Sequence, residues 1–474
     1  MVKLGTVSAP LRVAIIGSGP AGFYAAERLQ KEKRLVVEID MFERLPTPFG
    51  LVRGGVAPDH QKIKSVTSLY DRIARKPGFH FYGNVEFGVD ITHEDLLHFY
   101  HAIIYAVGAQ SDRRLNIPGE DLPGSHSATE FVAWYNGHPD FRDREFDLSQ
   151  ESVAVIGVGN VAIDVARVLL RTPAELARTD IADYALEALS NSNVRRVYIL
   201  GRRGPAQAAF TNAEIKELGE MEGAECIVDP KDLELDPLSK AYLESGADPV
   251  AEKNIQVLAV YARKPAGKKP RQLILRFLVS PVEILGTDHV EAIRVVHNEL
   301  YAAEDGTLRP RATGQYEEIP VGLVFRSVGY RGVPLPGVPF YDRWGVIPND
   351  RGRVLTEHET GSLVIGEYAV GWIKRGPTGV IGTNRPDAIE TVELLLEDLR
   401  AGRLLSPPKP SREAMERLLS GRGIRYVTYE DWLVIDELEQ QAGRALGRPR
   451  LKFCSVEEML EALAEAKQAL PVEE

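Results

Sequence analysis

The fold class of this chain is decided by the stretch Leu11-Arg12-Val13-Ala14-Ile15-Ile16-Gly17-Ser18-Gly19-Pro20-Ala21-Gly22. An apolar run that ends in Gly-x-Gly-x-x-Gly and continues into a helical pattern predicts a strand, a tight turn and a helix. The first glycine permits the turn, the second lets backbone approach a pyrophosphate, and the third lets the helix pack closely on the strand. The free amides of the helix N-terminus then face the phosphates. We therefore predict a dinucleotide site that includes Gly17, Gly19, Pro20 and Ala21.

A second fingerprint follows 140 residues later. The apolar run Val153–Ile156 leads into Gly157-Val158-Gly159-Asn160-Val161-Ala162, which again opens a helical pattern. A single match of this kind is weak evidence, but two matches in the same context are strong evidence. We predict an α/β fold with two Rossmann-like (βαβ) dinucleotide-binding domains, and electron transfer between two dinucleotides is the simplest function for such a chain.

The bulk properties exclude several classes of protein. A chain of 474 residues is too long for one compact core, so we expect two or three domains. No apolar run approaches the roughly 20 residues of a membrane span, and Met1–Pro10 lacks a signal-peptide pattern, so we expect a cytoplasmic protein. A net charge of −11 argues against nucleic-acid binding. The two cysteines, Cys226 and Cys454, exclude a disulfide framework, a Cys-x-x-Cys pair and a built-in iron–sulfur cluster.

The residues that end the second strand of each unit distinguish the two sites. Glu43 stands 21 residues after Gly22, where an acid accepts hydrogen bonds from an adenosine ribose, and this favours FAD or NAD. In the second unit, the matching strand ends in Arg202-Arg203. Their guanidinium groups can form charge-assisted hydrogen bonds to a 2′-phosphate. Ala162 in place of the third glycine also favours NADP. We predict FAD at the first site and NADP at the second. The alternatives are that Glu43 is a solvated glutamate at a strand end and that Arg202-Arg203 is an exposed pair without a ligand.

The remaining pattern indicates how the units follow one another. Strands are expected at 11–16, 35–42, 102–107, 196–200, 281–285, 292–297, 322–328 and 362–365, and helices at 20–32, 161–171, 174–190 and 385–400, with 255–330 rich in strands. A return to the first domain is expected after Gly329. The Pro-rich stretch 406–410 reads as a linker, and Ser455 and Glu458 as a capping box. The expected division is 1–108 and 331–405 for the FAD domain, 109–330 for the NADP domain and 406–474 for a C-terminal helical extension.

Long motifs add a family resemblance. Residues 46–60 read PTPFGLVRGGVAPDH and residues 371–384 read GWIKRGPTGVIGTN. Together with 159–164, 201–205 and 207–211, they closely resemble the adrenodoxin reductase family, in particular its bacterial ferredoxin–NADP(+) reductases. The resemblance covers nearly the whole chain. It implies an NADP domain inserted in a discontinuous FAD domain, hydride transfer between NADPH and FAD, and single-electron transfer between FAD and an external iron–sulfur protein such as ferredoxin.

The resemblance also implies which residues form the sites. Those implied for FAD are Ala21, Glu43, Leu51, Val85, Trp372, Gly379, Val380 and Ile381. Those implied for NADP are Gly159, Asn160, Val161, Ala162, Arg202, Arg203 and Glu214, with Gly379 near the nicotinamide. His60 and Glu214 are candidates to orient the nicotinamide carboxamide or to hold a water molecule, although His60 alone also suits a structural histidine. No metal is expected.

Docking of an acidic ferredoxin on this acidic chain requires a local basic patch. Lys374 and Arg375, beside the expected flavin loop, are the first candidates. A second basic cluster lies at 263–271 and also suits a solvated hairpin. Three other functions compete with a reductase. A disulfide reductase would need a cysteine pair, and a glutamate-synthase-like flavoprotein subunit would carry a cysteine-rich N-terminal segment. A non-enzymatic flavin or NADP sensor stays open.

The arginine pair generates a first prediction. Replacing both Arg202 and Arg203 with Ala should raise the Michaelis constant for NADPH far more than that for NADH, because only NADPH carries the 2′-phosphate. Steady-state reduction of a small dye with each nucleotide measures the preference. An unchanged preference would contradict the 2′-phosphate assignment.

Overall fold

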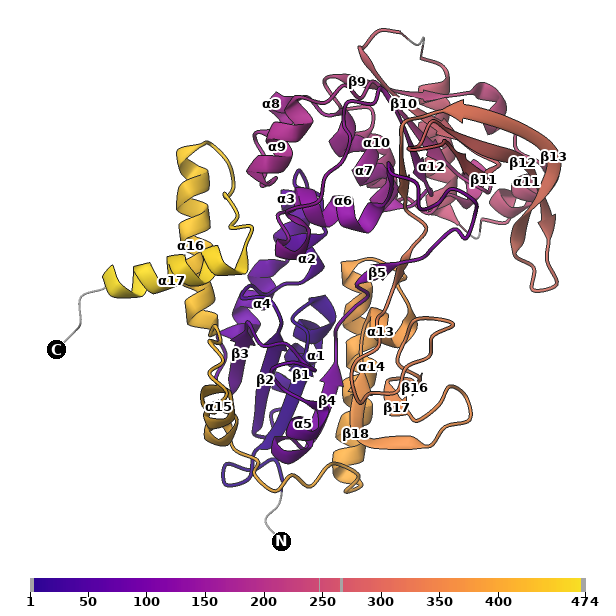
Figure 1. Ribbon diagram of the computed structural model, residues 1–474. Helices are drawn as coiled ribbons and strands as arrows, with labels where there is room; N and C mark the ends of the chain where they lie inside the picture. The colour runs from indigo at the N-terminus through magenta and orange to yellow at the C-terminus, as the bar shows by residue number, and fades with distance from the viewer. Residues whose placement is uncertain (1–3, 247, 265–266, 470–474) are drawn as a thin grey trace.

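Two sheets organise the protein, of which the computed structural model describes residues 4–246, 248–264 and 267–469 (Figure 1). The first sheet has seven strands in the order β16-β17-β18-β4-β1-β2-β3. Their bounds are β1 Leu11–Ile16, β2 Val37–Glu43, β3 Phe79–Gly83, β4 Ala102–Tyr105, β16 Asn349–Asp350, β17 Arg353–Leu355 and β18 Leu363–Ala369. All six residues of β1 are buried, as expected for a parallel strand covered on both faces.

Helices cover this sheet and form the first unit with it. They are α1 Pro20–Gln30, α2 Leu51–Gly54, α3 Gln61–Lys64, α4 Thr67–Ala74, α5 His93–Phe99, α13 Trp372–Arg375, the 3-10 turn η4 Ile381–Thr383 and α14 Asn384–Arg400. One apolar cluster joins α1, α4 and α14 to the strands through Phe23, Tyr70 and Leu395. Helix α14 begins at Asn384, as the sequence predicts.

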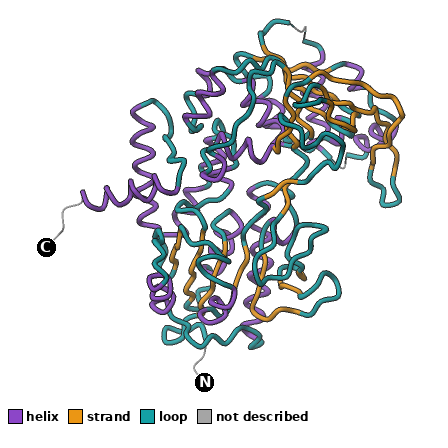
Figure 2. The backbone as a smooth tube through the Cα atoms, in the orientation of Figure 1, coloured by secondary structure: helices purple, strands orange, loops and turns teal. Residues whose placement is uncertain are grey.

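In the sequence, the second unit is inserted between two parts of the first unit. Its parallel sheet has the order β6-β14-β7-β8-β10-β9, with β6 Ser125–Ser127, β7 Ser152–Ile156, β8 Arg196–Leu200, β9 Ala224–Val228, β10 Arg271–Arg276 and β14 Leu323–Arg326. The chain then returns to the first sheet, where β18 pairs in parallel with β4, Glu367 opposite Ile103. A doubly wound domain inserted in a discontinuous one confirms the predicted fold class. Figure 2 shows the strands in two groups, with a connection between them.

Further elements complete the second unit. Its helices and 3-10 turns are α6 Ala128–Tyr135, η1 Pro139–Phe141, α7 Asn160–Leu170, α8 Pro173–Leu176, α9 Asp183–Ser190, η2 Pro205–Gln207, α10 Asn212–Glu217, η3 Pro230–Leu233, α11 Pro237–Glu244 and α12 Pro249–Ala262. An antiparallel sheet of β11 Val279–Leu285, β12 Ala292–Ala302 and β13 Leu308–Pro320 packs on it through Val279, Ile293 and Leu200. Where the chain passes between the units, β5 Ser111–Asp112 pairs with β15 Tyr330–Arg331.

The prediction that residues 255–330 are rich in strands is wrong at its start. Helix α12 continues to Ala262, and the strands begin at Arg271. The run Val257-Leu258-Ala259-Val260-Tyr261 has the β-branched and aromatic composition of a strand. The helix signal lies upstream, where Asp248 accepts hydrogen bonds from the amides of Val250 and Ala251.

The C-terminal helices α15 Arg412–Gly421, α16 Tyr429–Ala445 and α17 Val456–Ala469 pack on the first unit (Figure 1). Trp432 is buried and lies edge-on to Phe49, their ring centroids 5.8 Å apart. Ser455 accepts a hydrogen bond from the Glu458 amide at 3.1 Å, but the Glu458 carboxylate binds the Cys454 amide instead of completing the predicted capping box.

The segment after α16 connects the two units. The Lys452 ammonium donates to the carbonyl oxygens of Asn136, at 3.1 Å, and Arg53, at 3.4 Å. The Arg448 guanidinium donates to the Thr179 carbonyl oxygen at 2.9 Å. None of the helices among the described residues combines the length and apolarity needed to cross a membrane.

The close packing of α1 on β1 generates a second prediction. A Cβ on Gly22 would lie 2.5 Å from the Gly17 carbonyl oxygen, whereas a Cβ on Gly421 would meet nothing within 4 Å. Gly22→Ala should therefore destabilise the FAD-loaded protein by about 1–3 kcal/mol, since overpacking displaces backbone. Urea unfolding measures the loss, with Gly421→Ala as the matched control. Equal stability of the two variants would contradict the close approach.

Candidate functional site

The first fingerprint has the geometry that a pyrophosphate requires. Gly17 has φ +100°, and a Cβ there would lie 2.6 Å from the Ala106 carbonyl oxygen. A Cβ on Gly19 would meet no atom within 4 Å, so the space beside the second glycine is open. Helix α1 has Pro20 in its first turn and no side-chain cap, which leaves its N-terminal amides available to an anion.

Glu43 is held beside this turn. Its carboxylate accepts hydrogen bonds from the Ser18 hydroxyl at 2.6 Å and from the Ser18 and Leu45 amides at 3.1 and 3.2 Å. The carboxylate therefore has a fixed orientation at the end of β2. Val85 lies next to it and donates its amide to the Glu43 carbonyl oxygen at 2.9 Å. The Val85 side chain is buried in the core, so only its backbone is placed near this site.

A strained segment lies over the fingerprint. Phe49 has φ +87°, which is rare for a non-glycine residue, and its amide donates to the Ser18 carbonyl oxygen at 3.1 Å. A Cβ on Gly50 would lie 3.0 Å from the Cα of Gly19. Leu51 follows and is 37% exposed, although it is a large apolar residue. Such strain at a predicted binding loop is typical of a functional site.

The late segment forms an exposed loop. The Trp372 indole donates to the Thr378 carbonyl oxygen at 3.2 Å, and its ring lies 5.3 Å from that of Tyr330. Gly379 has φ +78°, and a Cβ there would lie 2.3 Å from the Thr383 hydroxyl oxygen. Val380 is 52% exposed, and Ile381 begins the turn that leads into α14. The loop thus exposes the Val380 side chain and a stretch of backbone at Gly379 that carries no side chain.

Lys374 is buried and paired with acids, which leaves little of its surface for the predicted docking role. Its ammonium lies 3.1 Å from the Asp387 carboxylate and 2.7 Å from the Glu390 carboxylate, and only 8% of the residue is exposed. Arg375 is half-buried and donates to Thr378, Thr383 and Asn384 at 3.1 to 3.2 Å. Both cations hold the loop to α14 and offer no free charge to a partner. In the second basic cluster, at 263–271, Arg271 is also buried.

The second fingerprint repeats the first. Gly157 has φ +130°, and a Cβ there would lie 2.2 Å from the Ser327 carbonyl oxygen, whereas a Cβ on Gly159 would meet nothing within 4 Å. Helix α7 again lacks a side-chain cap. Asn160 accepts a hydrogen bond from the Thr211 amide at 2.9 Å, which joins the fingerprint to the start of α10. Val161 is half-buried, and Ala162 is fully buried at the third position.

Arg202 and Arg203 follow β8, where the sequence predicts them. Arg202 is exposed and Arg203 is half-buried. Neither forms an ion pair with any acid in the part of the chain that the structure describes. Burial and the charge of Arg202 lower the pKa of Arg203. Two adjacent guanidinium groups without a carboxylate are suited to a dianion.

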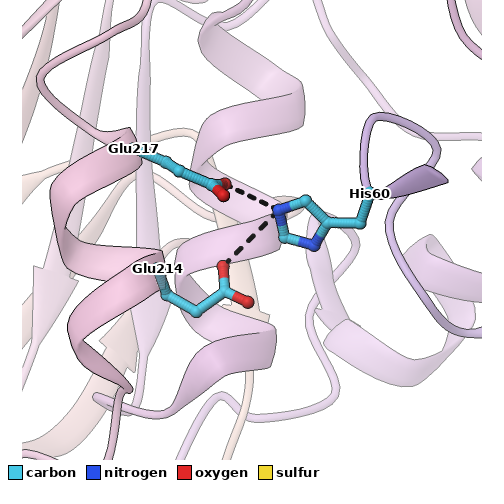
Figure 3. Close-up of side chains that lie close together, drawn as sticks. All are labelled: His60, Glu214 and Glu217. Carbon is cyan, nitrogen blue, oxygen red and sulfur yellow. Dashed lines mark hydrogen bonds and ion pairs between the residues drawn. The ribbon is translucent and has the colours of Figure 1, made fainter. Parts of the chain in front are cut away.

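His60 and Glu214 come together where the two units meet. His60 precedes α3, while Glu214 and Glu217 lie on α10, and both carboxylates point toward the imidazole (Figure 3). The His60 Nε2 atom lies 2.6 Å from a Glu217 oxygen and 3.7 Å from a Glu214 oxygen. His60 and Glu214 are both buried.

The Arg167 guanidinium on α7 organises this cluster. It lies 2.8 Å from Asp59, 2.7 Å from Asp164, 3.1 Å from Glu214 and 3.0 Å from Glu217. The His60 Nε2 atom is 2.7 Å from Arg167 Nη2. The cluster therefore joins a segment of the first unit to two helices of the second.

The cluster shifts the pKa values of its members. Burial lowers the pKa of His60, but the hydrogen bond to Glu217 and the charges of Asp164 and Glu214 outweigh burial and Arg167, so the pKa is raised. Burial raises the pKa of Asp164 to about 7, against the opposing charge of Arg167. A buried acid with a strongly raised pKa beside a histidine whose pKa is also raised is typical of functional sites.

His60, Glu214 and Glu217 also have the residue types and spacing of a metal site, with ligand atoms within 4.8 Å of one another. The Arg167 guanidinium, however, contacts the same three side chains at 2.7 to 3.1 Å. A divalent cation would have to displace it. We interpret the group as an ion-pair cluster.

Sequence reasoning missed the roles of Asp59, Asp164, Arg167 and Glu217. Asp164 and Arg167 stand three residues apart on one face of the helix that follows the second fingerprint. That spacing was a usable signal, but it does not identify a partner on another unit.

Comparisons with known proteins agree with this geometry. Residues 11–215 match the family of pyridine nucleotide-disulphide oxidoreductases. The chain is 48% identical over 459 residues to NADPH-ferredoxin reductase FprA of Mycobacterium tuberculosis, covering 95% of this chain and 98% of that one. It is 42% identical over 464 residues to human mitochondrial NADPH:adrenodoxin oxidoreductase, covering 95% and 92%. The structure of Mycobacterium tuberculosis FprA in complex with NADPH superposes with a TM-score of 0.90 at 47% identity, covering 96% and 100%.

The buried cluster generates a third prediction. Arg167→Met should destabilise the protein by about 3–5 kcal/mol at pH 8, because it leaves buried carboxylates without a partner cation. Without the guanidinium, the folded-state pKa values of these acids rise above their unfolded values. They take up protons on folding, so the deficit should shrink as the pH falls to 5.5.

Urea unfolding at both pH values measures this deficit. Arg178→Met is the control, since Arg178 is exposed and forms no ion pair within the described ranges. A deficit that is independent of pH would contradict the proposed charge balance.

Proposed function

This chain belongs to the adrenodoxin reductase family of NADPH-ferredoxin reductases, and we propose that it transfers electrons between NADPH and a small iron–sulfur protein such as ferredoxin. It is an FAD-dependent oxidoreductase, and its two cofactors are FAD and NADP. The proposal is carried by the pair of fingerprints, each with open space beside its second glycine and an uncapped helix behind it. FprA and human adrenodoxin oxidoreductase are covered over 98% and 92% of their lengths, which favours a reductase.

The residues of the first unit fit FAD. We propose that the α1 amides bind its pyrophosphate and that Glu43 binds its adenosine ribose. Leu51 and Val380 are large apolar residues left exposed, and a flat ring system would cover such surface. Trp372, Gly379 and Ile381 belong to the same late loop as Val380, and we propose that they also contact FAD. Gly379 has no side chain to obstruct a ring. Bound FAD supplies the exchange between hydride transfer and single-electron transfer.

The residues of the second unit fit NADPH. We propose that Asn160, Val161 and Ala162 position its pyrophosphate, and that Arg202 and Arg203 bind the 2′-phosphate. His60 and Glu214 are proposed to orient the nicotinamide carboxamide. Hydride transfer needs proximity and alignment more than acid–base groups. The ion pairs that hold His60 and Glu214 rigid therefore serve the reaction by positioning.

The finer assignments are proposals too. We propose the division 1–108 and 331–405 for the FAD domain, 109–330 for the NADP domain and 406–474 for the extension, and we propose the cytoplasm as the location. The glutamate-synthase-like subunit is disfavoured because FprA and human adrenodoxin oxidoreductase, of which this chain covers 98% and 92%, are both named as reductases of iron–sulfur proteins. The experiment below distinguishes the reductase from a non-enzymatic flavin or NADP sensor.

A fourth prediction tests the function. Rapid mixing of the FAD-loaded protein with NADPH under anaerobic conditions should bleach the flavin absorbance within seconds. Subsequent addition of an oxidised ferredoxin should restore the absorbance, and a cytochrome c coupled assay should then depend on ferredoxin. A flavin that stays oxidised would indicate a sensor, and bleaching without ferredoxin-dependent turnover would contradict the proposed partner.

A further inference from the structure

The backbone of the arginine pair is bound by the small antiparallel sheet. The side-chain amide of Asn298, on β12, donates to the Arg202 carbonyl oxygen at 2.9 Å. The Leu278 amide donates to the Arg203 carbonyl oxygen at 3.1 Å, and the Val279 amide to the Gly201 carbonyl oxygen at 2.9 Å. Three consecutive carbonyl groups of the loop are therefore held by β11, β12 and the residue that precedes β11.

Asn298 is itself held in place. It is 8% exposed, and its side-chain amide also donates to the Ser280 hydroxyl at 2.8 Å. Its backbone amide donates to the Leu278 carbonyl oxygen at 2.7 Å. Arg202 and Ser280 thus both accept hydrogen bonds from the side-chain amide of Asn298, while Leu278 holds its backbone. Because the Arg202 carbonyl oxygen can only accept, it fixes which end of the Asn298 amide faces it.

Two backbone irregularities produce these contacts. Leu278 has φ +56°, which is uncommon for a branched apolar residue and turns its amide toward Arg203. The register of β12 against β13 shifts between Val296 and Asn298, as in a β-bulge. Bulges re-aim side chains and strained residues cluster at binding sites, so both features point to a function at this place.

The arginine pair needs such support. Arg202 and Arg203 are adjacent like charges, and no carboxylate among the described residues forms an ion pair with either. Their repulsion favours separation of the two guanidinium groups, whereas a phosphate requires both on one side. Rigid backbone contacts reduce the entropy lost when the phosphate binds.

We propose that Asn298 is a positioning residue for the recognition of the 2′-phosphate of NADPH, acting through the backbone of Arg202. The inference rests on the proposed role of the arginine pair. It makes Asn298 a determinant of the preference for NADPH over NADH, although it does not touch the nucleotide.

The fifth prediction uses the uncharged, similarly sized variant Asn298→Leu. The Michaelis constant for NADPH should rise about 3- to 10-fold, as expected for loss of the hydrogen bond to the Arg202 carbonyl oxygen, while the value for NADH and kcat with saturating NADPH stay unchanged. In the Arg202→Ala/Arg203→Ala background, Asn298→Leu should cause no further rise, because residues that act as a unit are not additive. Dye reduction by the FAD-loaded protein measures all constants.

The control is Thr313→Val, which removes a hydrogen bond of 2.8 Å to the carbonyl oxygen of His297, the neighbour of Asn298, without touching the arginine loop. It should leave both constants unchanged. If Asn298→Leu does not fold, Ser280→Ala removes the second partner of the amide and should shift the NADPH constant in the same direction.

Three outcomes would overturn the inference. An unchanged NADPH constant in Asn298→Leu, while the arginine variant loses its preference, refutes the role of Asn298 alone. An equal rise for NADPH and NADH shows a general structural effect. Retained preference in the arginine variant refutes the 2′-phosphate site and, with it, this inference.

Discussion

One fully buried guanidinium, that of Arg167, joins the two units at the place where their fingerprint-bearing sheets meet the His60 cluster. It contacts Asp59 from the first unit and Asp164, Glu214 and Glu217 from the second. Charges in such a poorly solvated place are stable only with good geometry and complete pairing. A displacement of either unit would separate these charges, so the cluster favours the observed arrangement. The nicotinamide-orienting role proposed for His60 depends on that arrangement.

Both proposed sites use strained backbone that the surrounding structure holds in place. Phe49 lies over the first fingerprint and is supported by Trp432 of the C-terminal extension. Leu278 supports the arginine loop of the second. In each case a non-glycine residue with positive φ directs an amide to the carbonyl group of a binding loop. The C-terminal helices and the small antiparallel sheet, which are additions to the two doubly wound units, therefore serve the sites from outside.

Sequence reasoning identified the parts of the molecule that depend on local chemistry. The fingerprints, the inserted topology and the arginine pair follow from glycine spacing, apolar runs and charge, and the fold class is confirmed. The docking role of Lys374 stays a prediction, and the sequence could not show that Asp387 and Glu390, a helical turn apart, enclose its ammonium. The start of the strand-rich stretch was wrong because the run 257–261 has strand composition within a helix. The roles of Arg167 and Asn298 depend on contacts between distant segments, which no local pattern records.

The inserted topology also orders the folding of the chain during synthesis. The sheet of the second unit is built from one continuous stretch, from β6 to β14, whereas the first sheet lacks β18 until residues 363–369 emerge. Domains fold as units during translation, and strands distant in sequence pair slowly. The inserted unit can thus complete its core while the edge of β4 that will pair with β18 is still unpaired. On the ribosome, the first unit is therefore the later of the two to complete its sheet.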